Sequence, residues 1–310
     1  MKNLTEEERA AEAEELKSRI DDFDALTEER EKLTITDLQT YMIVKERILE
    51  ARQYLFTGNN DSASFGYVNE RLNSAVAWSR FFGKEGEVYN LDEESLEESC
   101  SEILADVEER FQYLNLFFPG LLNDLKNNLL TAHKHYETKE YALCIYLASR
   151  TKAEANIMVT MLGVKEDFVD ELIEQKIKAA KRAVTKQIDK GIFPIIAYSY
   201  YEYATSLQEE EVYSALLYSE YALELSDIDI YFEKKAQGRD WSGIKPKLKQ
   251  YAPTATFIWG LILGLLLCWL ILRERRKGKK APKPAEKVRK VKRKPVRRKK
   301  GRTRTSLRLR

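Results

Sequence analysis

The sequence offers few residues of the kinds that carry out catalysis or hold a metal ion. Its two histidines, His133 and His135, lie two positions apart, so on a helix their side chains point about 200° apart and cannot share a metal ion. The acidic group Asp21, Asp22 and Asp24 lacks the glycine and the spacing of a calcium-binding loop. No glycine-rich phosphate loop and no GxSxG motif occurs. The sequence therefore predicts no catalytic, cofactor-binding or metal-binding residue.

Three cysteines are present, and their spacing does not define a disulfide framework. They are Cys100, Cys144 and Cys268, and Cys268 lies in a long apolar run, where it cannot easily pair with the others. Two interpretations stay open for Cys100 and Cys144. They form either a disulfide or two buried free thiols, and free thiols are the simpler interpretation.

An uncharged apolar run near the C-terminus is the clearest single element. Residues 254–272 read TATFIWGLILGLLLCWLIL, and a helix of about 20 apolar residues spans the hydrocarbon core of a membrane. We expect one transmembrane helix at residues 253–272. Gly260 and Gly264 form a GxxxG pair through which two such helices could approach closely.

A strongly basic tail follows that run. Residues 273–310 hold 21 of the 52 Lys and Arg residues and only two of the 50 acidic residues, so the tail carries +19 and the remainder −17. With few apolar residues the tail cannot bury a core, and we expect it to be disordered. It should contact anionic lipid head groups; binding to nucleic acid is the alternative, and without aromatic residues for stacking it would be independent of sequence.

The charge split also predicts an orientation in the membrane. By the positive-inside rule the tail stays in the cytosol and residues 1–250 lie outside, where Asn60 would be a candidate N-glycosylation site. The N-terminus, however, has no apolar segment typical of an export signal. We interpret the chain as the C-terminal part of a longer exported precursor, or as a gene whose start is assigned too late. The alternative, a cytosolic body with an exported tail, breaks the charge rule.

Apolar residues recur every three or four positions through the body, which predicts helices joined by short polar turns. Thr5 and Glu8 form a capping box that begins the first helix, and no alternation typical of strands occurs. The predicted organisation is an N-terminal helix in residues 1–35, a helical hairpin domain at 36–233, a juxtamembrane linker at 234–252, the transmembrane helix at 253–272 and the basic tail at 273–310.

Three hairpins within the helical domain resemble one another. Each has an alanine near the end of its first helix and a small residue at the start of its second, as in tetratricopeptide-like hairpins. These residues are Ala51 and Ala63, Ala132 and Ala142, and Ala204 and Ala215. Their spacing is irregular. We therefore predict an all-α fold of irregular tetratricopeptide-like hairpins, arranged as an α-solenoid or a bundle.

Two apolar features are candidates for contact with a partner. The first helix has only a thin apolar stripe, formed by Leu16, Ile20 and Phe23, which would bury more area against another domain than alone. The last hairpin is rich in tyrosine, which favours either packing between its two helices or a groove for an extended peptide. The candidate contact residues in that hairpin are Tyr198, Tyr201, Tyr213 and Tyr218.

Three stretches of the body resemble the helical region that follows the protease domain in exported archaeal Lon-type serine proteases. They are NDSASFGYVNERLNSAVAW, KEYALCIYLASRTKAEANIMVTMLGV and YSYYEYATSLQEEEVYSALLYSEYALELSDIDIYF, and the resemblance extends over about residues 36–272. In that family a signal peptide and a Lon-type domain with a Ser–Lys dyad precede the helices, and a transmembrane helix follows them. Here no proline precedes a serine, as the loop of the family's nucleophile requires, so no catalytic residue can be carried over.

These observations together predict a membrane-anchored, non-catalytic interaction module. The resemblance implies that it is the accessory part of an extracytoplasmic Lon-type serine protease system, with a Lon-type protease domain or substrate polypeptides as partners. The alternative is a membrane tether whose basic tail binds ribosomes, nucleic acid or anionic lipid. No cofactor is expected under either hypothesis.

Overall fold

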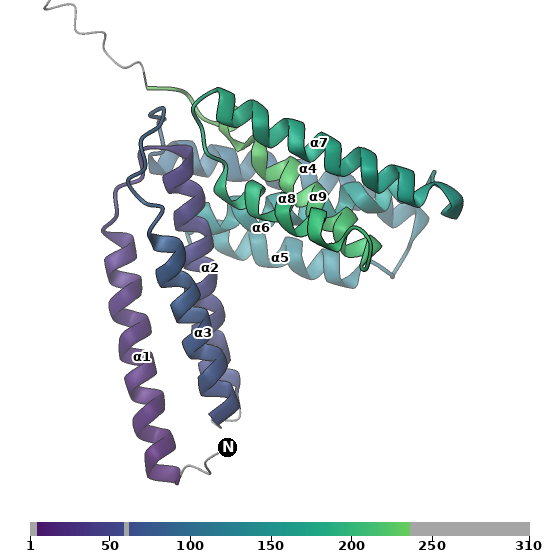
Figure 1. Cartoon of the computed structure of the whole chain (residues 1–310). Coiled ribbons are helices and arrows are strands. Elements are labelled where there is room, and N and C mark those ends of the chain that lie inside the picture. Colours follow the sequence, from purple (N-terminus) through teal and green to yellow (C-terminus); the bar gives the residue numbers. More distant parts are fainter. Residues whose placement is uncertain (1–4, 59–61, 236–310) are drawn as a thin grey trace, which may run out of the picture. The chain divides into compact units, whose positions relative to one another are not determined.

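The computed structural model describes residues 5–58 and 62–235, and within these ranges the chain is all-helical (Figure 1). Nine α-helices and two 3-10 turns occur in this part, where the only β pairing is two isolated bridges. The helices are α1 (Glu6–Glu28), α2 (Ile35–Thr57), α3 (Ser62–Ser79), α4 (Glu93–Phe117), α5 (Asn123–Glu137), α6 (Tyr141–Met161), α7 (Val169–Asp189), α8 (Ile195–Leu207) and α9 (Val212–Ser226), with the 3-10 turns η1 (Glu166–Phe168) and η2 (Ile228–Tyr231). The predicted all-α class is confirmed.

Several predicted features lie outside the described residues. The chain divides into two units, Met1–Gln237 and Gly238–Arg310, and the predicted transmembrane helix and basic tail belong to the second. Gly260, Gly264 and Asn60 are likewise outside the described ranges. Among the helices that are described, none combines the length and the hydrophobicity needed to cross a membrane.

Helices α1, α2 and α3 pack on one another through a core of their own. The capping box predicted at Thr5 is present, because Thr5 Oγ1 accepts a hydrogen bond from the Glu8 amide at 3.2 Å and the Glu8 carboxylate accepts one from the Thr5 amide at 2.8 Å. The core between the three helices consists of Leu16, Ile20, Val44, Ile48, Ala51, Leu55, Phe65, Val68, Leu72 and Ala75. The segment that the sequence assigned to a separate N-terminal helix thus shares a core with the next two helices.

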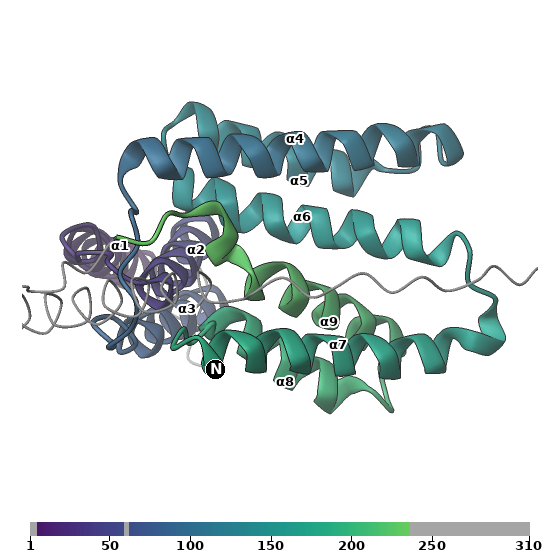
Figure 2. The ribbon, with the colours of Figure 1, turned by 90° about the horizontal axis from the view of Figure 1, so that it is seen from above.

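Helices α4 to α9 form a second group, and α6 is its central element (Figure 2). Residues 141–155 of α6 are almost continuously buried, which requires small and apolar side chains around most of the helix. The turns α4–α5, α6–α7 and α8–α9 lie at one end of this group, and α1–α3 lie at its other end (Figure 2).

The first half of α2 connects the two groups. Leu38, Met42 and Ile43 belong to the large core formed with α4, α6, α8 and α9, whereas the second half of α2 packs on α1 and α3. Gln39 is fully buried. Its side-chain Nε2 donates a hydrogen bond to the Leu225 carbonyl at 2.8 Å, and its Oε1 accepts one from the backbone amide of Ile196 at 3.0 Å. Helix α8 has no side-chain cap of its own, so Gln39 satisfies one of its free amides.

A disulfide joins α4 to α6 inside this large core. Cys100 and Cys144 are fully buried and bonded, and their Cα atoms are 5.9 Å apart, a usual separation for a disulfide. Of the two interpretations open from the sequence, the simpler one, two free thiols, is therefore wrong.

Candidate functional site

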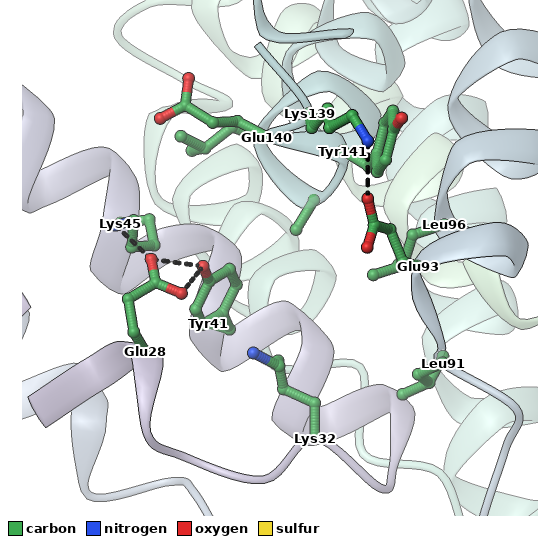
Figure 3. A pocket seen from close by; sticks show the side chains of 12 residues that line it. Glu28, Lys32, Tyr41, Lys45, Leu91, Glu93, Leu96, Lys139, Glu140 and Tyr141 are labelled. Carbon is green, nitrogen blue, oxygen red and sulfur yellow. Dashed lines mark hydrogen bonds and ion pairs between the residues drawn. The ribbon is translucent and has the colours of Figure 1, made fainter. Parts of the chain in front are cut away.

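A cleft of about 420 Å³ lies where the α1–α2 turn meets the start of α4 and the α5–α6 turn (Figure 3). Three lysines and three glutamates line it, together with two tyrosines. Leu91, Leu96 and Leu143 contribute apolar surface. These three segments are far apart in the sequence, so the cleft exists only in the folded chain.

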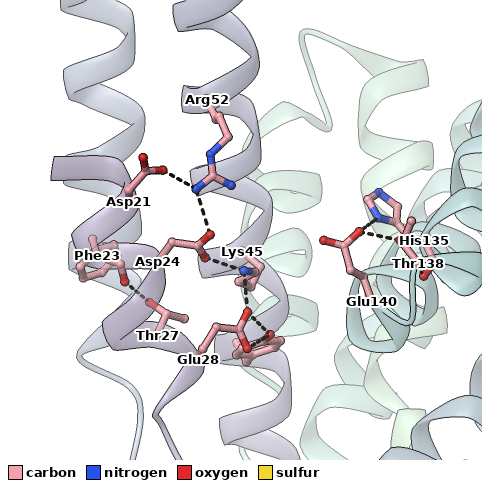
Figure 4. Close-up of polar contacts among 11 residues, drawn as sticks. Asp21, Phe23, Asp24, Thr27, Glu28, Lys45, Arg52, His135, Thr138 and Glu140 are labelled. Atoms are coloured by element: carbon pink, nitrogen blue, oxygen red, sulfur yellow. Dashed lines mark hydrogen bonds and ion pairs between the residues drawn. The ribbon is translucent and has the colours of Figure 1, made fainter. Parts of the chain in front are cut away.

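One wall of the cleft is a connected set of charged groups on α1 and α2 (Figure 4). Lys45 Nζ lies 2.5 Å from Asp24 Oδ1 and 2.6 Å from Glu28 Oε1, and Tyr41 donates to Glu28 at 2.8 Å. Arg52 continues the set through Asp24 at 3.0 Å. Burial, followed by the hydrogen bond to Glu28, raises the pKa of Tyr41 well above its usual value. Each charge on this wall therefore has a partner, and the wall is held in one arrangement.

The opposite wall is the α5–α6 turn, where Lys139 has a left-handed backbone with φ of 63°. This residue directly follows the C-cap of α5, a position where glycine is favoured because other residues lose about 1–2 kcal/mol there. Its ammonium is 3.4 Å from Glu93 in an exposed ion pair. Glu140 accepts hydrogen bonds from His135 at 2.8 Å and Thr138 at 2.9 Å. Burial alone would raise the pKa of Glu140, but these two hydrogen bonds lower it.

Lys32 projects into the open part of the cleft from the α1–α2 turn (Figure 3). Its ammonium lies 4.1 Å from the centre of the Tyr41 ring, a cation–π contact. Burial lowers the pKa of Lys32, although the nearby carboxylate of Glu28 raises it in part. Lys45 and Lys139 have ion pairs, whereas no carboxylate of the described residues lies within ion-pair distance of Lys32. Lys32 is thus a half-buried cation that contacts the Tyr41 ring and has no ion-pair partner among the described residues.

The partner stripe predicted on the first helix is used within the chain. Leu16 and Ile20 are buried against α2 and α3, and Phe23 packs at the edge of the same core. The prediction assumed that these side chains would stay uncovered without another domain. The structure covers them, so they offer little surface to a partner.

The four candidate tyrosines of the last hairpin are not brought to one place. Tyr218 is half-buried and stacks on Tyr200 with ring centres 5.6 Å apart, as packing between helices predicts. Tyr201 also packs into a core, whereas Tyr213 is exposed at the start of α9. Tyr198 lies near the start of α8 and lines an apolar groove of about 270 Å³ with the α3 end and Phe193. Of the four candidates, Tyr198 is therefore the one that lines this groove.

An apolar turn, residues 113–122, protrudes at the far end of α4. Leu116 is 79% exposed, Leu121 78% and Phe117 52%, and the segment YLNLFFPGLL has no charged residue. Leu114 and Leu122 in the same segment are buried and anchor it to α5 and α6. The protruding side chains are therefore held on a fixed base. Nothing in the sequence pattern indicated that these side chains would be uncovered.

The histidines have structural partners. His133 Nε2 lies 2.8 Å from Glu108, and His135 lies at the same distance from Glu140. Within the described ranges no group of three His, Cys, Asp or Glu residues is placed to hold a metal ion.

Comparison with known proteins adds no relative. No family model, no curated protein and no solved structure matches this chain. Function therefore has to be inferred from the cleft, the apolar turn, the disulfide and the charge distribution.

Proposed function

We propose that the chain is a membrane-anchored, non-catalytic helical interaction module whose body binds a polypeptide partner outside the cytoplasm. The apolar turn carries this proposal. Leu116, Phe117 and Leu121 are exposed within six residues of one another, in a segment without a charged residue, and exposed apolar surface of this kind marks sites of interaction. Full burial stabilises by roughly 1.5–3 kcal/mol for each such side chain, so three of them can support a specific complex.

The apolar turn and the last described residue lie near different ends of α4. The described chain ends at Lys235, whose amide bonds to the Val88 carbonyl at 2.9 Å beside the start of α4. The apolar turn follows the other end of α4, a helix of 25 residues, which is about 37 Å long. The turn and the last described residue thus lie toward opposite ends of α4, and a polypeptide is the occupant that we propose.

Two features support an extracytoplasmic body. A disulfide between Cys100 and Cys144 lies in the core, and disulfides persist mainly in oxidising compartments. The +19 tail against a −17 remainder supports a tail in the cytosol, next to anionic lipid, by the positive-inside rule. Protease treatment of intact cells should then digest residues 1–250 and spare the tail. The reverse pattern would reject this topology.

We further propose a Lon-type protease domain, or one of its substrate polypeptides, as the partner. The support is the resemblance of three stretches, which fall on α3, on α6 and on the α8–α9 hairpin. We include in this proposal that the hairpins α2–α3, α5–α6 and α8–α9 are irregular relatives of tetratricopeptide hairpins, which commonly present a surface to other polypeptides.

Site-specific photo-crosslinking in cells tests the proposal. A crosslinking amino acid at Leu116 or Leu121 should capture an extracytoplasmic polypeptide, and the same group at Leu26, which is 59% exposed on α1, should not. The double variant Leu116→Ser/Leu121→Ser should lose the captured polypeptide and keep its melting temperature. Crosslinks only to lipid, only to a second copy of the chain, or equally from Leu26 would reject a polypeptide partner at this turn.

A further inference from the structure

We propose that the cleft between the α1–α2 turn and the α5–α6 turn binds the C-terminal carboxylate of a polypeptide whose last residue is apolar. Lys32 would bind the carboxylate, Lys139 would add positive charge on the other wall, and the leucines of the cleft would contact the last side chain. The inference rests on the proposed function only in taking the partner to be a polypeptide. It concerns a different surface, and each can fail without the other.

The distribution of paired and unpaired charges assigns the anion to Lys32. The carboxylates of Glu28 and Glu140 already accept hydrogen bonds from Tyr41 and His135. The ammonium of Lys32 contacts a tyrosine face and no carboxylate of the described residues. A bound carboxylate would give this half-buried cation the hydrogen-bonded partner that it lacks, and hydrogen bonds between ions are the stronger ones.

Lys139 is a second cation that lines the cleft, on the wall opposite Lys32. It has a left-handed backbone with φ of 63°, although a residue other than glycine loses free energy there. Its ion pair with Glu93, at 3.4 Å, joins two side chains that are 71% and 68% exposed. Such a pair is weak, so Lys139 can turn from Glu93 to a ligand.

The surroundings select a single carboxylate over more highly charged anions. Three glutamates line the cleft, no arginine does, and phosphate groups favour the bidentate guanidinium of arginine. The three carboxylates would repel a dianion or a polyanion more strongly than a monoanion. Leu91, Leu96 and Leu143 lie beside the charged groups, so the ligand should carry an apolar group next to its charge. A peptide that ends in an apolar residue meets both conditions, and capture of a C-terminal carboxylate is a known mode of peptide recognition.

Two matched peptide pools test the inference on the full chain in nanodiscs. Both are fluorescein-labelled pentapeptides with four random positions and a final leucine, and they differ only in ending as a free carboxylate or a carboxamide. We expect the chain to retain the free-acid pool roughly tenfold better, as an ionic hydrogen bond implies. Lys32→Met should remove this preference and Lys32→Arg should keep it. Lys126→Met, at an exposed position of α5 away from the cleft, is the matched control and should keep it.

Each outcome decides the question. Equal retention of the two pools, or a preference that survives in Lys32→Met, overturns the inference. N-acetyl-leucine should displace the free-acid pool at lower concentration than inorganic phosphate does, and the opposite order would indicate a general anion site and also overturn it. If the pools bind equally while Leu116 still crosslinks to a polypeptide, the cleft inference alone fails. If the preference holds and the crosslinks fail, the role of the apolar turn fails.

Discussion

Removing the disulfide between Cys100 and Cys144 should destabilise the body by several kcal/mol. The bond closes a loop between residues 44 positions apart. In the chain-entropy model a loop of this size corresponds to about 4 kcal/mol at 25 °C. A change of 1 kcal/mol shifts the melting temperature of a domain of 150–250 residues by roughly 2–4 °C, so the expected loss is about 8–16 °C. The variants Cys100→Ala, Cys144→Ala and the double variant all lack the bond and should melt in the same low range. Cys268→Ala leaves the pair intact and is the control.

Thiol labelling of the native protein provides the direct assay. The protein is purified without reductant, unfolded in urea and treated with a maleimide, and the mass counts the free thiols. We expect one label, on Cys268, and three labels after reduction. Three labels before reduction would refute both the bond and the inference of an oxidising compartment that depends on it. A melting temperature of Cys100→Ala equal to that of the unchanged protein would refute the assigned magnitude.

Three further changes test particular contacts by chemical unfolding. Lys139→Gly should stabilise the chain by about 1 kcal/mol, because glycine adopts the left-handed backbone without a loss of free energy. Lys139→Ala should give no such gain in stability. Equal effects of the two variants would contradict the left-handed backbone at this position. Ile20→Ala should lower the free energy of unfolding by roughly 2–5 kcal/mol, because Ile20 is 1% exposed. Leu26→Ala on the same helix should change it by no more than about 0.5 kcal/mol. An Ile20→Ala variant of unchanged stability would show that α1 does not pack as described. Gln39→Met should lower the free energy of unfolding by about 1–3 kcal/mol for each buried backbone group that it leaves unpaired. Gln53→Ala, at an exposed position of α2, should leave the stability unchanged. A Gln39→Met variant of unchanged stability would mean that water bonds to these backbone groups.

Local signals were sufficient to predict the helices. The repeat of apolar residues at three and four positions and the short polar turns define each of them. The Thr5–Glu8 capping box depends on contacts within one turn, and the structure contains it as predicted. A signal of this kind can be read from sequence because both partners lie a few residues apart.

The surface that covers the apolar stripe of the first helix could not be predicted in the same way. A thin stripe of Leu16, Ile20 and Phe23 suggests a helix that buries little area by itself. In the structure, residues along the whole of α3 and in the second half of α2 together cover Leu16 and Ile20. Whether a stripe faces its own chain or a partner depends on where later helices pack, and the stripe itself contains no such information.

The cleft and the disulfide depend on contacts between distant segments. Lys32 and Lys139 are more than a hundred positions apart in the sequence, and only the packing of α2 against α6 brings their two turns to one cleft.

The disulfide and the charge split are independent indications of the same topology. The charge split depends on lysines and arginines at residues 273–310, and the disulfide depends on two buried cysteines of α4 and α6. A cytosolic body would meet a glutathione pool that keeps thiols reduced, and its basic tail would have to cross the membrane against the positive-inside rule. Both difficulties disappear when the body lies outside. In the proposed topology the apolar turn and the cleft would meet extracytoplasmic polypeptides, which are the partners that we propose.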